Sequence, residues 1–196
     1  MNRENALALL EWANEKNPGP WREHSLGVAR AAEAIARECG MDPEKAYIMG
    51  LMHDIGRYEG VTAMRHIFAG YELMLEKGEP ETARICLTHS FPHPDIETYF
   101  GEKDVTETDI ALLTEVLKTP MDDWDRLIQL CDALAMGTGV CLMEKRLIDV
   151  IRRHGSIPLM QQKINATMEI FEYFRNKMGK NLYSLFPEAV ENTFGK

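Results

Sequence analysis

Hydrophobic residues recur along this chain at the three- and four-residue spacing of an amphipathic helix, and no convincing strand-like alternation interrupts them. One such stripe contains His24, Val28, Ala31 and Ile35, so an imidazole shares a helix face with hydrophobic residues. The predicted helices cover approximately residues 4–16, 21–40, 42–56, 80–90, 108–118, 122–136, 140–153 and 158–178. One more predicted helix carries His66 and ends at residue 78. The pattern therefore predicts an all-α protein built as a helical bundle.

Prolines, glycines and capping residues separate these helices. The segment 17–20, Asn-Pro-Gly-Pro, cannot continue a helix, and Gly40 is a good C-terminal cap. Asp42 followed by Pro43 is a strong N-cap and first-turn pair. Because 196 residues suffice for one sizeable core and no repeat or Gly/Ser linker divides them, we expect a single domain.

The composition is that of an ordinary soluble globular protein, with 45% hydrophobic and 27% charged residues. No apolar run approaches the length of a membrane span. The N-terminus mixes acidic with apolar residues and does not resemble a signal peptide. We therefore expect a cytoplasmic location and no membrane partner, while the sequence leaves the oligomeric state open.

The cysteines and the net charge exclude other classes of protein. The four cysteines lack any Cys-x-x-Cys spacing, which argues against a thiolate zinc site and against a disulfide scaffold. The formal net charge of −9 would repel a nucleic acid polymer, so we expect none as a partner. A small phosphorylated substrate remains compatible, because bound divalent cations can reverse the local potential.

Several polar side chains are predicted to lie inside the bundle. Asp132 occurs within the apolar run LIQLCDALAM, and burying an ionised carboxylate is costly unless it is paired or bound to a metal. His24 and the adjacent pair His53 and Asp54 also accompany hydrophobic residues. Each alone would more often be a hydrogen-bonded core residue, but imidazoles and carboxylates together are the ligands of divalent metals.

The order of these residues resembles the H…HD…D signature of the HD-domain metal-dependent phosphohydrolases. His24 supplies the first histidine, residues 53–56 read His-Asp-Ile-Gly, and Asp132 supplies the last aspartate. The resemblance implies an all-α HD-type fold and one metal held by His24, His53, Asp54 and Asp132. It implies hydrolysis of a phosphoester or phosphoanhydride by metal-bound hydroxide.

The resemblance also suggests a division of the chain. We expect residues 1–20 to form a helix that packs on the core, 21–136 to form the HD metal-binding core, and 137–196 to add helices that complete the same domain.

His66 and His89 extend the resemblance to the family members that hold two metals. These two histidines would bind the second metal, with Asp54 bridging both. By the same resemblance iron or manganese is expected, with magnesium, cobalt, nickel and zinc as other candidates. The spacing looks like that of small enzymes that cleave diadenosine tetraphosphate symmetrically, so a small phosphorylated substrate such as a nucleotide is the expected partner.

Other polar residues near the motif are candidates for binding the substrate. We expect Arg57 and Arg65 to bind phosphate oxygens as cationic catalytic groups, with exposed surface arginines as the equally weighted alternative. His93, in the loop Phe-Pro-His-Pro-Asp, is either solvated or able to reach a substrate. His154 is interpreted as a partner of its helix dipole without a catalytic role.

Two other functions fit the same ligands. A few HD-fold proteins, such as myo-inositol oxygenase, use a similar set with two irons to activate dioxygen. A sensor that binds a nucleotide without turnover is the third hypothesis, although no ligand is missing. The HD-type cyclic-di-GMP phosphodiesterases are disfavoured, because their His-His-Glu segment and Gly-Tyr-Pro tripeptide do not occur here.

Overall fold

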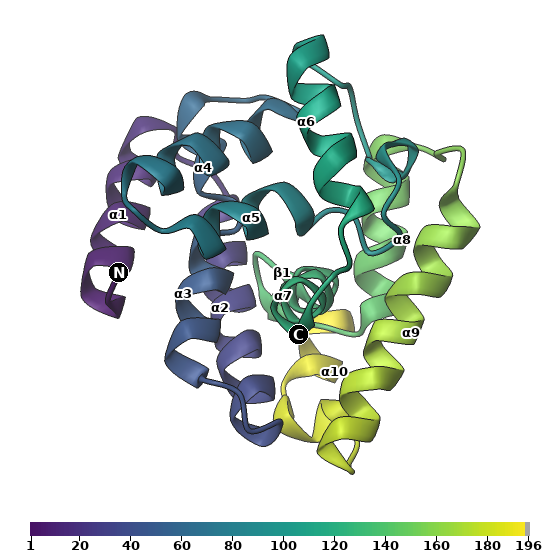
Figure 1. Ribbon diagram of the computed structural model, residues 1–196. Coiled ribbons are helices and arrows are strands. Elements are labelled where there is room, and N and C mark those ends of the chain that lie inside the picture. The colour runs from purple at the N-terminus through teal and green to yellow at the C-terminus, as the bar shows by residue number, and fades with distance from the viewer. Residues whose placement is uncertain (195–196) are drawn as a thin grey trace.

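The computed structural model describes residues 1–194, and helices make up most of them (Figure 1). The α-helices are α1 Arg3–Lys16, α2 Trp21–Glu38, α3 Pro43–Met52, α4 Arg65–Glu76, α5 Pro80–Thr88, α6 Glu107–Lys118, α7 Asp123–Leu134, α8 Met143–His154, α9 Met160–Met178 and α10 Ala189–Phe194. Short 3-10 helices occur at η1 Ile55–Glu59, η2 Ile96–Thr98 and η3 Leu182–Leu185. The predicted all-α helical fold is confirmed.

Helix starts follow the local sequence. The carboxylate of Asp42 accepts hydrogen bonds from the main-chain N–H groups of Glu44 (2.9 Å) and Lys45 (3.1 Å), so it caps α3 as predicted. Thr106 and Asp122 open α6 and α7 with capping boxes. The caps of α3 and α7 fix where these two helices begin, and candidate metal ligands lie at the end of α3 and within α7.

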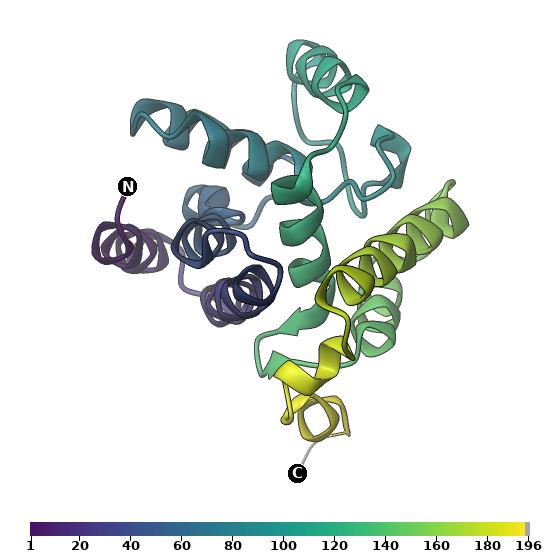
Figure 2. The same ribbon diagram turned by 60° about the horizontal axis from the view of Figure 1, so that its bottom comes forward.

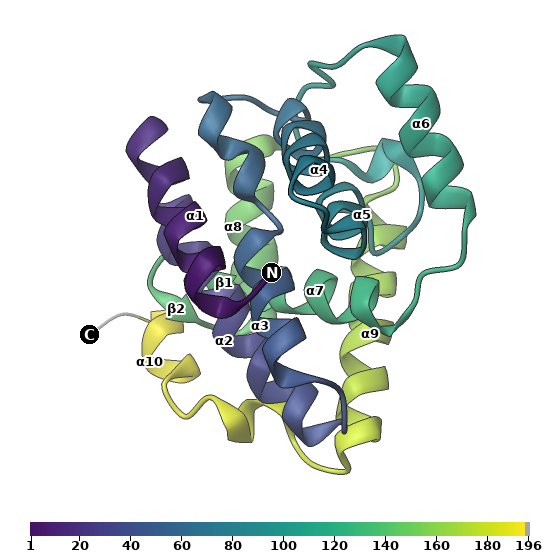
Figure 3. The same cartoon turned by 60° about the vertical axis from the view of Figure 1, so that its left-hand side comes forward.

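Helix α7 lies at the centre of the molecule. Figure 2 shows it between the N-terminal helices α1 to α5 and the C-terminal pair α8 and α9. Leu130 and Phe174 belong to the core between α2, α7 and α9. A second core, with Leu10 and Leu51, joins α1 to α3, and a third, with Leu113, lies under α6, which stands at one edge in Figure 3. None of the described helices is long and apolar enough to cross a membrane.

Two glycines allow main chains to approach closely beside the motif. A Cβ atom added to Gly50 would lie 2.8 Å from the Cα atom of Ala29, so α3 packs tightly on α2. A Cβ atom on Gly56 would lie 2.0 Å from the carbonyl oxygen of His66 and 2.3 Å from the nitrogen of Gly70. Any side chain at position 56 would therefore push α4, which carries His66, away from η1.

The structure corrects three details of the predicted elements. Helix α3 ends at Met52, so residues 53–56 form its cap and the start of η1 instead of its last turn. Helix α7 ends at Leu134, and the strands β1 Ala135–Met136 and β2 Gly139–Val140 pair in an antiparallel ladder that the sequence did not predict. The elements η3 and α10 were also not predicted. A two-residue ladder is too short to give a detectable alternation.

Candidate metal centre

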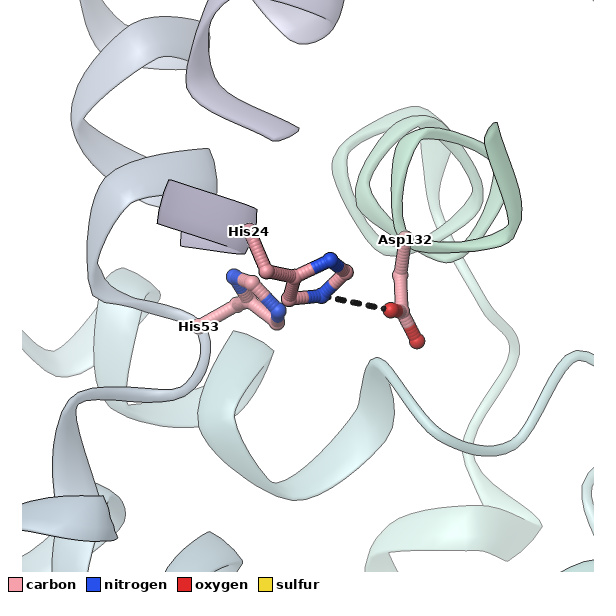
Figure 4. A group of neighbouring side chains, drawn as sticks. All are labelled: His24, His53 and Asp132. Carbon is pink, nitrogen blue, oxygen red and sulfur yellow. Dashed lines mark ion pairs between the residues drawn. The ribbon is translucent and has the colours of Figure 1, made fainter. Parts of the chain in front are cut away.

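Six side chains with metal-binding donor atoms come together from separate elements. They are His24 of α2, His53 and His89 at the C-terminal ends of α3 and α5, Asp54 before η1, His66 of α4 and Asp132 of α7. Donor atoms of His24, His53 and Asp132 lie within 4.8 Å of one another (Figure 4). A second group with the same spacing contains His53, Asp54 and His89. The structure therefore brings all six predicted ligands into one cluster.

Each of the four histidines directs its Nδ1 atom at a main-chain carbonyl oxygen. The pairs are His24 with Ala135 (3.2 Å), His53 with Gly50 (2.7 Å), His66 with Ala63, and His89 with Cys86 (2.9 Å). A carbonyl oxygen can only accept, so Nδ1 carries the proton that it donates. In a neutral ring the Nε2 atom then presents a lone pair, which is the usual arrangement of metal-binding histidines.

Two of these Nε2 atoms face carboxylates. His24 Nε2 lies 3.0 Å from Asp132 Oδ1, and His66 Nε2 lies 3.0 Å from Asp54 Oδ1. Two lone pairs at this distance repel each other unless a proton or a metal cation intervenes. Burial lowers the pKa of His66 and so disfavours a second proton there. Divalent metal ions would fit this donor set.

The buried histidine between these pairs supports the same interpretation. His53 is 1% exposed, and its Nε2 atom has no hydrogen-bond partner among the described residues. Burial lowers the pKa of His53, and it lowers that of His89 to about 4, so both rings are neutral at pH 7. A neutral, unpartnered imidazole nitrogen is costly to bury unless something binds it, and a metal ion would do so.

Both aspartates are held in their ionised form. Burial would raise the pKa of Asp54, but the positive charge of the Arg57 guanidinium, with Nε 2.7 Å from Oδ2, holds it well below its usual range. The same balance keeps the pKa of Asp132 low: burial would raise it, while His24 and Arg146 lower it. The centre therefore combines neutral imidazoles with negative carboxylates, which suits a divalent cation.

A cavity of about 700 Å³ opens onto the cluster. Its cationic lining residues are Arg57, Arg146, Arg153 and Lys163, and aromatic rings of Trp21, Tyr99 and Phe100 also contribute. This volume is within the range of small-molecule sites, about 300 to 1,000 Å³. Arg57, a predicted substrate-binding residue, is therefore placed where it can contact a bound ligand.

The structure places two other sequence candidates outside this lining. The guanidinium of Arg65 pairs with Glu59 (2.8 Å) and Glu72 (2.8 Å), and Arg65 does not line the cavity. These ion pairs neutralise the charge of Arg65 and favour the alternative of a surface arginine, so phosphate binding by Arg65 stays a prediction. His93 also does not line the cavity, and its carbonyl oxygen accepts a hydrogen bond from Thr98.

Four basic residues of α8 and α9 that line the cavity were missed by the sequence prediction. They are Arg146, Arg153, His154 and Lys163, all beyond the segment that carries the motif. The seven-residue spacing of Arg146 and Arg153 places both on one face of α8, and this was a usable signal. His154 lies in the last turn of α8, as its interpretation as a dipole partner requires, and it also faces the cavity beside Phe100, with ring centroids 6.4 Å apart.

The fold and the cluster define an all-α protein with a candidate metal centre. Residues 21–137, more than half of the chain, match the model of the family described as HD domain. This chain belongs to the HD domain family.

The sequence is also similar to parts of longer curated proteins. It is 39% identical to ribonuclease Y of Mesoplasma florum over 59 residues, 30% of this chain and 12% of that protein. It is 32% identical to ribonuclease Y of Mycoplasma capricolum over 94 residues, 47% of this chain and 16% of that protein. The chain thus spans only a small part of these relatives. No solved structure matches it significantly.

Proposed function

We propose that this protein is a metal-dependent phosphohydrolase that cleaves a phosphoester or phosphoanhydride bond of a small substrate, with nucleotides as the first class to test. The observation that carries the proposal is the pairing of His66 with Asp54, in which an imidazole whose pKa is lowered by burial lies 3.0 Å from an ionised carboxylate. A cation between them removes the repulsion. Membership of the HD domain family supports the same chemistry.

The chain's own residues would hold and orient the reacting groups. Bound divalent metal ions would supply a water molecule of lowered pKa and positive charge opposite the phosphate oxygens. The carbonyl groups that accept from each Nδ1 fix the orientation of the imidazoles, so that the ligands are preorganised. Arg57, fixed by Asp54, would direct its remaining N–H groups to a nonbridging phosphate oxygen.

Two metals per chain are part of the proposal, with iron or manganese as the expected ions. Asp54 Oδ1 lies 3.0 Å from His66 Nε2 and 3.6 Å from His89 Nε2, while Oδ2 lies 3.8 Å from His53 Nε2. The carboxylate of Asp54 thus stands between two sets of histidines. One oxygen for each set is the arrangement that a bridging ligand would need.

The comparisons favour one further substrate class. The relatives are named ribonuclease Y, and a phosphodiester bond of RNA is therefore the second candidate substrate. The net charge of −9 supports small substrates instead, because long polyanions are repelled over the whole surface. Dioxygen activation by two irons and nucleotide binding without turnover are the remaining alternatives.

A single panel of assays separates these functions. Protein loaded with manganese and, separately, with iron would be tested under air and under nitrogen with nucleoside mono-, di- and triphosphates, diadenosine tetraphosphate and a short oligoribonucleotide. We expect phosphate or nucleotide release at the same rate in both atmospheres, loss of activity with a chelator, and slower cleavage of the oligoribonucleotide. Oxygen-dependent turnover would indicate an oxygenase, and binding without release of product would indicate a sensor.

A further inference from the structure

Lys163 of α9 is a buried lysine in the wall of the cavity, 9% exposed. Its Nζ atom donates hydrogen bonds to the carbonyl oxygens of Ser90 (2.7 Å) and Thr98 (2.8 Å). An ammonium group carries three donors, so one N–H remains unused by the described residues. The two bonds give Lys163 a structural role in holding the segment after His89, but they leave one donor for a ligand.

The charge of Lys163 is not neutralised in the way that the charges of its neighbours are. Arg57, Arg146 and Arg153 each have a carboxylate oxygen within 4.0 Å, namely of Asp54, Asp132 and Asp149 respectively. Within residues 1–194, no such oxygen lies that close to Lys163 Nζ.

The remaining contact of the ammonium group is the face of the Phe100 ring, whose centroid lies 4.9 Å away. Carbonyl dipoles and an aromatic face stabilise a cation less than a carboxylate does. Burial accordingly lowers the pKa of Lys163 to about 8. A buried cation without an acidic partner, beside a cavity, is the complement of an anionic ligand group.

The position of Lys163 relates this charge to the candidate metal centre. Lys163 lines the same cavity as Asp54, His66 and Asp132, and the carboxylate of Asp132 stabilises its charged form through space. Helix α9 lies beyond residues 21–137, so the match to the HD domain does not include it. This cation is therefore a feature of the C-terminal helices added to the HD core.

We infer that Lys163 binds a second acidic group of the substrate, the phosphate adjacent to the phosphoryl group held at the metal centre. The inference rests on the proposed function and deepens it: the preferred substrates carry two or more linked phosphates, as nucleoside diphosphates and dinucleoside polyphosphates do. A monophosphate would occupy only the metal centre and would leave Lys163 without a phosphate group to bind.

Binding of two simple probes tests this inference without turnover. Methylphosphonate has one phosphonate group, and methylenediphosphonate has two linked by carbon, so neither contains a phosphoester or phosphoanhydride bond. Their dissociation constants would be measured by calorimetry with manganese-loaded wild type, Lys163→Met and Lys163→Gln. The glutamine amide still offers N–H donors to the carbonyl groups of Ser90 and Thr98, which keeps a folded comparison if the methionine variant unfolds.

The matched control is Lys177→Met on the same helix. Lys177 pairs with Asp123 and does not line the cavity. Chelation of manganese by the diphosphonate affects all variants equally, so the ratio of the two dissociation constants within each variant is the quantity to compare.

We expect wild type and Lys177→Met to prefer methylenediphosphonate, and both Lys163 variants to lose about 10-fold or more of that preference, the loss typical of a charge-assisted hydrogen bond. An unchanged ratio, or equal weakening of both probes, would overturn the inference and leave Lys163 a structural residue. A lost preference in a protein without any hydrolase activity would uphold the subsite and reject the proposed hydrolysis. Hydrolase activity together with an unchanged ratio would uphold the proposed hydrolysis and reject the subsite.

Discussion

At the scale of single residues, the protonation states of the histidine and aspartate side chains define the candidate metal centre. Main-chain carbonyl groups hold the protons of the four Nδ1 atoms, and burial keeps His53, His66 and His89 from gaining a second proton. The ionised carboxylate of Asp54 then faces the Nε2 atom of His66, which can only accept. A metal ion resolves this conflict, which makes the loss of one carboxylate a sharp test.

We predict that Asp54→Ala removes both metals and abolishes hydrolysis while the helical content stays unchanged. The reason is that Asp54 faces both sets of histidines but lies outside any α-helix. Metal content and circular dichroism would be measured on the same sample. Asp42→Ala, at the other end of α3, is the control: it removes an N-cap, should cost about 1 kcal/mol, and should keep the metals. If Asp54→Ala retained its metals, Asp54 would not be a metal ligand and would act only as the ion-pair partner of Arg57.

The two arginines of the motif region are predicted to differ. Arg57→Ala should lower kcat by about 10² or more with unchanged metal content, because Arg57 lines the cavity and can stabilise developing negative charge. Arg65→Ala is the matched control, since Arg65 pairs with Glu59 and Glu72 outside the cavity, and its kcat should stay near that of wild type. Steady-state kinetics on the best substrate decides, and equal effects of both substitutions would contradict the assignment.

Lys163 should make stability depend on pH in a predictable direction. Its pKa is about 8 in the folded protein and 10.5 ordinarily, so between these values the unfolded state binds more protons and stability rises with pH. Urea unfolding from about pH 7 to pH 10 should therefore show wild type gaining free energy of unfolding relative to Lys163→Met. The control Lys177→Met should not show this gain, because Asp123 raises the pKa of Lys177. If the difference in free energy of unfolding between wild type and Lys163→Met did not change with pH, the two hydrogen bonds of Lys163 would offset the effect of burial on its pKa.

At the scale of elements, the motif depends on a helix end and a close contact. Helix α3 stops at Met52, and the turn that follows directs Asp54 towards α4. Gly56 permits that turn to lie against the main chain of His66. The glycine of the His-Asp-Ile-Gly segment therefore has a packing role: it sets the distance between two metal-binding elements.

We predict that Gly56→Ala destabilises the fold by about 3 kcal/mol or more, because its Cβ atom would meet main-chain atoms that cannot move aside cheaply. Gly27→Ala in α2 is the control, since its Cβ atom would meet Ala135 at an ordinary 3.4 Å, and alanine favours a helix. Chemical denaturation of both variants gives the comparison. Similar stabilities would show that η1 and α4 separate easily.

At the scale of the whole molecule, the centre joins α7 to helices from the N-terminal half of the chain. Metal bound to the folded state alone adds stability that grows with its affinity and concentration. The metal centre is therefore expected to hold the N-terminal helices and α7 together.

We predict about two transition metals per chain after purification without chelator, and a thermal midpoint lowered by about 5 °C or more on their removal. Elemental analysis and calorimetric melting would be compared with and without chelator. Asp54→Ala, which should lack the metals, should melt at the same temperature in both conditions. A metal content near one ion per chain, with the same value in His66→Ala, would indicate a centre with a single metal.

The order of residues predicted the helical fold and marked His24, His53, Asp54 and Asp132 as candidates, while the resemblance to HD-domain enzymes added His66 and His89. Periodicity shows which face of each helix is buried, and a histidine or aspartate on such a face, as at His24, indicates a need for a partner. These are local properties, so they are recorded directly in the spacing of neighbouring residues. The pattern of His24, His53, Asp54 and Asp132 is therefore visible in the sequence alone.

Which charges face the cavity, in contrast, depends on the tertiary structure. Arg57 and Arg65 look alike in the sequence, but one pairs with a candidate ligand and the other with surface glutamates. Lys163 carries no local signal at all, because its burial comes from segments more than 60 residues away. Whether a charged side chain finds a partner depends on contacts between distant segments, and helical periodicity contains no record of them.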